Sequence, residues 1–583
     1  MKSFFNTFLR IDLTRRTSRT EQIPDAVLRN TLGGKGLGSY LLLDNIPSGI
    51  DPLSPKNTLI IALGPVSGTT IPGSSRYGIF TKSPLTGLFS ESYAGGHAAE
   101  PMSRTGYDAF ILEGASEYPV FLEITDKDVL FHDAAHLWGK TTYETEDTIK
   151  KEIDAPKSAV LTIGPAGEQR IPYAVVENDY WRSAGRTGVG AVLGAKKVKA
   201  LAFHGQRRRE PAHPELLAAF VKKIRERGKT DPAAHAYKTL GTPMLVALNN
   251  AVDAFPSRYW HDGTCEEWEA LRAETMNEQL KPTPRACAQC FMACGKLSTV
   301  QDGRHTGLTI EGPEYETIFA FGGLCLISDL REIAFLNNLC DEMGLDTISA
   351  GNLCAFAMEA SSMGRVTERI PYGNPDATAG LLNDIVTRRG VGAVLAQGIR
   401  HAAKAWDMEE VAIHVKGMEP PGYEPRILKG MGLAYATSPR GACHLRATFY
   451  KAELSGMIDK DQIEGKAALF IDFEERLALH DMLIVCRFYR DLYMWDELSQ
   501  IITATTGMDM DKAGLRERAS YVIDLTRRFN IREGLTKADD SLPNRFFDEP
   551  LGREKKVVRR EDFYRMLSEY YHLRGWSEEG VPQ

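Results

Sequence analysis

Three cysteines lie close together in the stretch "RACAQCFMACGK", residues 285–296, with the spacing Cys-x2-Cys-x3-Cys: Cys287, Cys290 and Cys294. Thiolates bind soft metals, and both structural zinc and a [4Fe–4S] cluster normally take four ligands. Finger-like zinc sites pair one Cys-x2-Cys with a second pair downstream, and this chain has no second Cys-x2-Cys. The spacing therefore favours an iron–sulfur cluster over zinc, and both over unligated structural thiols, and it leaves the fourth ligand open.

Two segments elsewhere share a second pattern, an acidic residue separated by four residues from an Asp or a Cys. "DEMGLD" runs from Asp341 to Asp346, and "DMLIVC" runs from Asp481 to Cys486. In local terms, the first segment predicts a helix that ends at Gly344 in a left-handed cap, with Asp346 or a nearby serine capping the next helix. This local structure is compatible with ligand contacts at the helix ends.

The elements that must position these residues follow a clear order along the chain. Up to about residue 205, short β-branched and aromatic runs alternate with Gly, Pro, Asp and Asn, which is typical of strands and turns. The polar segment 204–215, which contains two prolines, predicts a linker. From residue 214 onward, apolar residues recur at helical spacing, with a further break at 414–426. The strand and helix predictions rest on the segments 57–65, 76–84, 108–114, 119–126, 158–165, 199–205, 214–227 and 331–343.

Composition limits the class of protein. The chain has 583 residues, 43% of them apolar, and a net charge of −7, which favours a multidomain globular enzyme and disfavours nucleic acid as a partner. The N-terminal apolar stretch is broken by Arg10 and Asp12, and no window of 18 uninterrupted apolar residues occurs, so we expect no signal peptide and no membrane span. Nine cysteines without regular spacing are unlike a disulfide framework and favour a cytoplasmic protein.

Taken together, the cysteine run and the paired Asp-x4 segments resemble the aldehyde:ferredoxin oxidoreductase family, whose members hold tungsten, or occasionally molybdenum, between two pyranopterins. The resemblance extends from "GGKGLG" at 33–38 to the closing "RGWSEEGVP". It implies that the two Asp-x4 segments each hold one pterin and that Cys486 is the fourth ligand of a [4Fe–4S] cluster. It further implies pterin contacts at Asp341, Gly344, Leu345, Asp346, Asp481 and Val485.

Other segments look like the walls of the family's pterin site. The resemblance implies contacts at Arg76, between the cluster and a pterin, and at two glycine-containing turns: Ala94, Gly95, Gly96, Ala184, Gly185 and Arg186. Bare backbone amides there can approach phosphates, with a magnesium ion bridging them. This chain departs from the family at Tyr93, where an Asn is usual, and at Ile484, where Gly is usual in the second Asp-x4 segment.

Three residues are candidates for catalysis. Tyr315 and Glu316 follow Pro313, where local structure alone predicts carboxylates in the first turn of a helix. A single histidine such as His444 is more often packed than catalytic. The resemblance places all three beside the metal, where imidazole suits proton transfer near neutral pH.

We therefore expect an α+β protein with the cofactor at the domain interface, comprising a β-rich pterin-binding domain (1–210) and two mainly helical domains (211–415 and 416–583). The resemblance implies oxidation of an aldehyde to a carboxylic acid, with electrons passing to ferredoxin or an iron–sulfur partner subunit in a homo- or hetero-oligomer. One alternative is the tungsten subunit of another redox enzyme of the family, such as an aryl-CoA reductase. Another is a non-catalytic iron–sulfur or zinc protein.

Overall fold

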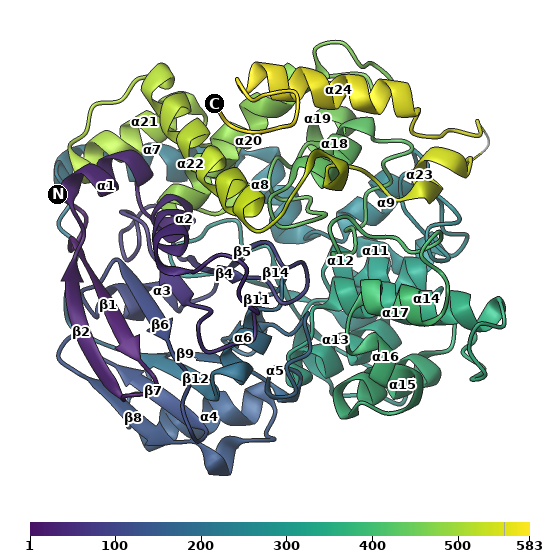
Figure 1. Cartoon of the computed structure of the whole chain (residues 1–583), viewed down its shortest axis with the longest axis horizontal. Helices are drawn as coiled ribbons and strands as arrows, with labels where there is room; N and C mark the ends of the chain where they lie inside the picture. Colours follow the sequence, from purple (N-terminus) through teal and green to yellow (C-terminus); the bar gives the residue numbers. More distant parts are fainter. Residues whose placement is uncertain (553) are drawn as a thin grey trace.

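A computed structural model describes residues 1–552 and 554–583 of the chain (Figure 1). The first 203 residues build two six-stranded sheets, in the orders β2-β1-β6-β3-β4-β5 and β11-β10-β9-β12-β7-β8. The strands are β1 Thr7–Asp12, β2 Thr17–Gln22, β3 Leu59–Ala62, β4 Tyr77–Lys82, β5 Phe89–Ala94, β6 Ala109–Glu113, β7 Val120–Ile124, β8 Val129–Asp133, β9 Ala159–Thr162, β10 Val176–Asn178, β11 Arg182–Ala184 and β12 Val198–Phe203.

The two sheets have the same topology. Read from its β8 edge, the second sheet runs β8-β7-β12-β9-β10-β11, so that each strand corresponds to the strand six places earlier in the first sheet. In each sheet one pair is parallel, β1 with β6 and β7 with β12, and the other pairs are antiparallel. Buried residues of both sheets share one core, in which Leu9, Ile61 and Phe110 lie with Leu122, Leu161 and Leu201. The β-rich part is therefore a structural duplication.

Helices fill the rest of the chain. Those within or beside the sheets are α1 Asp25–Thr31, α2 Gly34–Asn45, α3 Ala99–Ser103, α4 Thr142–Glu152, α5 Pro165–Glu168 and α6 Val189–Ala195. The later ones are α7 Pro214–Thr230, α8 Pro232–Thr239, α9 Met244–Asn250, α10 Trp268–Leu271, α11 Ala273–Leu280, α12 Tyr315–Thr317, α13 Leu330–Met343, α14 Thr347–Ser362, α15 Pro375–Thr387, α16 Gly390–Leu395, α17 Ile399–Ala405, α18 Lys429–Thr437, α19 Tyr450–Leu454, α20 Lys466–Leu483, α21 Trp495–Thr506, α22 Lys512–Arg532, α23 Asn544–Asp548 and α24 Arg560–Leu573.

This arrangement confirms the predicted fold class, a β-rich N-terminal region followed by a mainly helical one. All six predicted strands are present, as β3, β4, β6, β7, β9 and β12, and the two predicted helices are α7 and α13. The segment 204–212 lacks helix and strand, as predicted. The prediction missed the other six strands of the two sheets, because these carry more polar or small residues.

The helical region also contains a third, three-stranded sheet that the sequence did not predict. Its strands are β13 Thr283–Arg285, β14 Gly295–Thr299 and β15 Thr309–Glu311. The cysteine-bearing segment 286–294 connects β13 to β14, which are antiparallel neighbours. The cysteines therefore lie in a hairpin loop whose two ends are held together by strand pairing.

The helix expected to open at Pro313 begins at Tyr315 instead, with Glu314 as its N-cap residue. After one turn it passes into a π-helix, Ile318–Leu324. Such wide turns often lie at functional sites. None of the helices in the described part of the chain combines the length and apolar character needed to cross a membrane.

Candidate functional site

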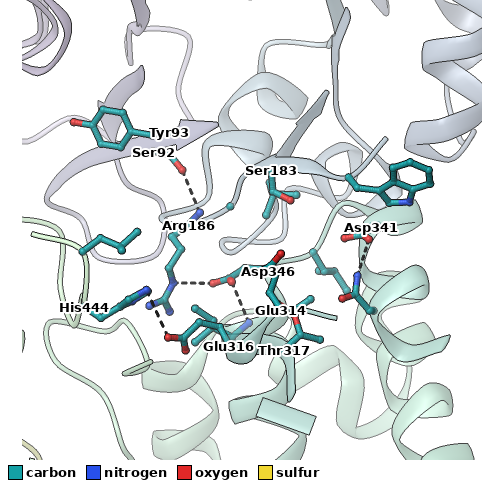
Figure 2. A pocket seen from close by; sticks show the side chains of 18 of the residues that line it. Ser92, Tyr93, Ser183, Arg186, Glu314, Glu316, Thr317, Asp341, Asp346 and His444 are labelled. Atoms are coloured by element: carbon teal, nitrogen blue, oxygen red, sulfur yellow. Dashed lines mark hydrogen bonds and ion pairs between the residues drawn. The ribbon is translucent and has the colours of Figure 1, made fainter. Parts of the chain in front are cut away.

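A cavity of ≈ 250 Å³ lies where the duplicated sheets meet the helical region (Figure 2). Its walls come from the ends of β5 and β11, from the segment around α12, from the junction of α13 and α14, and from the loop after α18. The residues that line it are Arg76, Ser92, Tyr93, Val175, Trp181, Ser183, Gly185, Arg186, Glu311, Glu314, Glu316, Thr317, Asn337, Asp341, Leu345, Asp346, Thr347, Ile348, Arg440, His444, Leu445, Arg446 and Arg487.

The first Asp-x4 segment forms the junction between α13 and α14. α13 ends at Gly344, whose φ of 75° is the predicted left-handed cap, and Asp346 caps α14 by accepting a hydrogen bond from the Ile348 amide at 3.1 Å. The Val175 amide donates to the Gly344 carbonyl at 2.9 Å. This segment is thus attached to the chain between α5 and β10, and Asp341 and Leu345 reach the cavity wall.

The second Asp-x4 segment has the same form at the end of α20. Ile484 adopts a left-handed conformation, φ 61°, although it is not glycine. The departure from the family pattern therefore leaves the backbone conformation intact, at the energetic cost that a β-branched residue pays there. The next residues turn toward the first sheet, where the Cys486 amide donates to the Gly73 carbonyl at 2.8 Å.

Each Asp-x4 segment packs against the equivalent glycine of one duplicated half. Gly64 follows β3 in "LGP", and Gly164 follows β9 in "IGP". A Cβ atom on Gly64 would lie 2.3 Å from the Leu483 carbonyl oxygen, and one on Gly164 would lie 2.3 Å from the Met343 carbonyl oxygen. Each half of the duplicated region thus contacts the end of one helix, an arrangement that suits a pair of similar ligands.

Arg186 connects three walls of the cavity. Its Nε donates to Asp346 Oδ2 at 3.0 Å, and its Nη2 donates to the Glu419 carbonyl at 2.9 Å. Its backbone amide donates to Ser92 Oγ at 3.2 Å, so that the β5 and β11 ends meet here (Figure 2). The guanidinium is consequently buried and held in one position.

His444 and Glu316 form a pair on the cavity wall, with Nε2 of His444 3.5 Å from Oε1 of Glu316 (Figure 2). Burial raises the pKa of Glu316 to about 8. Burial, with the charges of Arg186 and Arg440, lowers the pKa of His444 well below its usual value. Both groups are therefore neutral near pH 7, with the proton on the carboxyl group.

Tyr315 is adjacent in sequence but does not line the cavity. Its hydroxyl donates to the Gly422 carbonyl and accepts from Asn249 at 3.0 Å. The Gly422 amide in turn donates to Glu316 Oε2 at 2.9 Å. Tyr315 thus acts on Glu316 through the Gly422 peptide.

Two arginines on the cavity wall have N–H groups without hydrogen-bond partners, which indicates what kind of ligand the cavity can bind. Nε and Nη2 of Arg446 and Nη1 of Arg487 are buried and donate to no acceptor within the described residues. Both side chains form ion pairs with Asp481, that of Arg446 at 3.0 Å, and their remaining N–H groups lack an acceptor. Since buried unpaired donors are costly, the arrangement fits a polyanionic ligand such as a phosphate-bearing pterin.

The four expected cluster ligands come together from two parts of the chain. Burial, together with the nearby thiols of Cys486 and Cys287, raises the pKa of Cys290 to about 11. Burial, together with Glu314 and the same two thiols, raises the pKa of Cys294 well above its usual value. Within the described residues, however, no three His, Cys, Asp or Glu side chains are arranged to hold a single metal ion. In a [4Fe–4S] cube each of the four thiols binds a different iron, so a cluster does not need three of them around one ion.

Hydrogen bonds to the cysteine sulfurs add support. The Gly96 amide donates to Cys287 Sγ at 3.2 Å, and the Tyr489 hydroxyl donates to Cys290 Sγ at 3.4 Å. A Cβ on Gly95 would lie 3.1 Å from Cys287 Sγ and 3.7 Å from Arg76 Nη1. Arg76 therefore lies beside both the cavity and the cysteine site.

The structure brings together most, but not all, of the expected site residues. Those on the cavity wall are Arg76, Gly185, Arg186, Glu316, Asp341, Leu345, Asp346 and His444. The turn Ala94–Gly96 contacts the cysteine loop instead. The expected residues Ala184, Gly344, Asp481 and Val485 do not line the cavity. Sequence reasoning missed Arg440, Arg446, Arg487 and Tyr489, whose only signal is their closeness in sequence to His444 and Cys486.

Comparisons with known proteins show which proteins this chain is similar to. Protein-family models for aldehyde ferredoxin oxidoreductase match residues 8–205 (N-terminal domain) and 219–583 (domains 2 and 3). The tungsten-containing aldehyde ferredoxin oxidoreductases of Pyrococcus furiosus and Thermococcus kodakarensis are 34% and 36% identical to this chain, each over 98% of it and 96% of the relative. A solved structure, the active site complex BamBC of benzoyl coenzyme A reductase with 1,5-dienoyl-CoA, superposes with a TM-score of 0.85 at 25% identity, over 100% of this chain and 96% of the other.

Proposed function

Because this chain belongs to the aldehyde ferredoxin oxidoreductase family, we propose that it oxidises an aldehyde to a carboxylic acid in the cavity between its sheets and helices. Electrons would leave through a [4Fe–4S] cluster to ferredoxin or an iron–sulfur partner subunit. The observation that carries the proposal is the buried His444–Glu316 pair, which shares one cavity with unpaired arginine donors and lies near four convergent cysteines.

The residues present fit both cofactors that the family implies. Asp341 and Asp346 would hold one pterin at the α13 end, and Arg446 and Arg487 would hold the other at the α20 end. Cys287, Cys290, Cys294 and Cys486 would bind the cluster. When bound, the tungsten pterin supplies a two-electron acceptor, and the cluster passes the electrons on one at a time.

The chain's own residues handle the protons. Oxidation of an aldehyde, with the added oxygen atom taken from water, yields a carboxylic acid, two protons and two electrons. Neutral His444 can donate a hydrogen bond to the aldehyde oxygen, which polarises the carbonyl group. Glu316, in the fraction of molecules in which it is ionised given its pKa of about 8, accepts a proton from the water that adds. Tyr315 positions Glu316 through the Gly422 peptide. The surrounding burial excludes bulk water from the reacting groups.

Replacement of His444 by Ala tests this assignment. We expect aldehyde oxidation to fall by roughly 10²–10⁴-fold, the usual contribution of a positioned proton donor or acceptor, with tungsten and iron contents unchanged. Elemental analysis together with aldehyde-dependent reduction of a dye measures both. Full activity in the variant would remove His444 from the mechanism.

A second function in the same family is the dearomatising reduction of an aryl-CoA thioester. The full-length structural similarity to the benzoyl coenzyme A reductase complex favours it, whereas the higher sequence identity to the aldehyde enzymes favours oxidation. A panel of aldehydes and aryl-CoA thioesters, assayed in opposite redox directions, separates the two.

A further inference from the structure

A surface groove of ≈ 650 Å³ opens directly over the cysteine loop, on the face formed by α7 and α8. Two of the expected cluster ligands, Cys287 and Cys290, are part of its floor. The other lining residues are Arg225, Gly228, Lys229, Ala234, His235, Lys238, Gln289 and Phe291.

The groove is cationic on a protein that is anionic overall. Arg225, Lys229 and Lys238 are exposed, and no carboxylate lines the groove in the part of the chain that the structure describes. The adjacent turn of α7 adds exposed Lys222 and Lys223, and also exposed Glu226, which pairs with Lys229 at 2.7 Å, while Lys223 lies 3.7 Å from Glu497. Within the described residues Lys222, Arg225 and Lys238 form no ion pair, so the charge around the groove remains positive. Since the chain carries a net charge of −7, this local excess of positive charge is not a consequence of general composition.

The cations are held in a defined position relative to the cysteines. Phe291 of the cysteine loop lies against Gly228 of α7, where a Cβ atom would be only 2.3 Å from the Phe291 ring. On the same side, Arg225 Nη2 donates to Gln289 Oε1 at 3.0 Å. The loop therefore sits in a fixed register on α7, with Lys229 one residue beyond the contact.

A second groove, of ≈ 630 Å³, lies on the other side of the loop at Ala288. Its wall mixes carboxylates, Glu100 and Asp179, with cations such as Arg104 and Lys157, and it includes no cysteine. Of these two grooves, the α7–α8 groove is the one that combines cationic lining residues with direct contact to the expected cluster ligands.

We propose that the α7–α8 groove is the docking surface for a small acidic iron–sulfur electron carrier. This proposal rests on the proposed function, because the cluster must carry electrons outward for a carrier to dock there. A partner with a negative face would be steered to the groove by charge, and docking would place its own cluster close to Cys287 and Cys290. Electron transfer then needs no further protein cofactor.

The test uses the loaded enzyme and a double charge reversal, Lys229→Glu with Lys238→Glu. The matched control, Lys127→Glu with Lys151→Glu, changes two exposed lysines in the β7–β8 turn and in α4, at the opposite end of the molecule from α7 (Figure 1). The acceptors are an acidic two-[4Fe–4S] ferredoxin and benzyl viologen, a small dication that needs no docking surface.

We expect the groove variant to raise the KM for ferredoxin by about tenfold or more and to weaken its dependence on ionic strength. Viologen reduction and iron content should match those of the wild type and of the control. Equal ferredoxin kinetics in the groove variant and the control would overturn the docking assignment.

A binding measurement separates this outcome from failure of the proposed function. If no aldehyde reduces viologen in the wild type, the proposed reaction is wrong. Calorimetric titration with oxidised ferredoxin still measures whether the carrier binds to the groove. Ferredoxin binding that is lost only in the groove variant supports the docking site, and binding that both variants retain, or no binding to the wild type, overturns it.

Discussion

At the scale of single residues, the central feature is a buried pair in which the carboxyl group keeps its proton near pH 7. Burial penalises the charged form of both groups, so that Glu316 is protonated and His444 stays neutral. Such perturbed pairs are typical of active sites. Here the perturbation places the ionisation of the carboxyl group within a range that can be measured.

The activity of the enzyme should depend on pH through Glu316. Its pKa is raised from 4.5 to about 8, so below pH 8 the carboxyl group is protonated and cannot accept a proton, and above pH 8 the carboxylate can. We expect kcat to rise through about pH 8 in the wild type, and we expect Glu316→Gln to be slow and to lack this rise. A steady-state pH profile with saturating aldehyde measures it.

Glu314→Gln is the matched control for this prediction. Glu314 also lines the cavity, but its carboxylate accepts from Thr242 rather than pairing with His444. The control should keep the rise near pH 8. A rise that persists in Glu316→Gln would assign the titration to another group.

Tyr489 should tune the cluster. Its hydroxyl donates to Cys290 Sγ at 3.4 Å, and hydrogen bonds to cluster sulfurs stabilise the reduced state. Tyr489→Phe should therefore lower the reduction potential of the cluster while iron content stays the same. A potentiometric titration followed by electron paramagnetic resonance measures the shift. An unchanged potential would mean that this contact has no electronic effect.

At the scale of elements, the ends of α13 and α20 form equivalent contacts with the two sheets. α13 and α20 each end in a left-handed residue, and each presents its last carbonyl to a glycine after a strand, Gly164 or Gly64. Because the strands belong to equivalent positions in the duplicated sheets, the site has two similar halves, each with its own supporting contact.

Gly164→Ala should disturb one of these halves. The added methyl group would meet the Met343 carbonyl at 2.3 Å, and relief of such overpacking costs about 1–3 kcal/mol. We expect a lower thermal midpoint and reduced tungsten retention. Gly380→Ala in α15 is the control, because nothing lies within 4 Å of its Cβ position, and alanine favours the helix. Equal behaviour of the two variants would contradict the close contact.

At the scale of the whole molecule, parts that are distant in sequence share one framework. α2 contacts α20 and α22, and α7 contacts α21, so the N-terminal region and the last helices pack directly together. We propose domains at 1–210, 211–415 and 416–583. The irregular segment 204–212 and the helix-free stretch between α17 and α18 support these divisions.

Local patterns were sufficient for much of the fold. The apolar strands β3, β6 and β9 and the amphipathic helices α7 and α13 could be predicted, because burial imposes a period on their residues. The strand pairs that build the cavity wall could not. β5 and β11 read "FSESYA" and "RSA", and their small polar residues serve the site rather than the core. The duplication is equally hidden, since it lies in strand order and not in residue identity.

The site required more than local patterns. Spacing located Cys287, Cys290 and Cys294, but only the family resemblance proposed Cys486, which lies 192 positions beyond Cys294. Arg446 and Arg487 could not be assigned to the site, because the sequence does not distinguish a buried arginine with unpaired N–H groups from an exposed one. Their unpaired donors become evident only when the packing around Asp481 is known.

The most direct test of the whole account is an anaerobic optical titration of the oxidised, metal-loaded protein with aldehyde. We predict that aldehyde alone bleaches the iron–sulfur absorption, with about four iron and one tungsten or molybdenum per chain and with carboxylic acid as the product. A protein that contains both cofactors but is bleached by no aldehyde, and is instead bleached by a dienoyl-CoA thioester, would contradict the assignment of aldehyde oxidation.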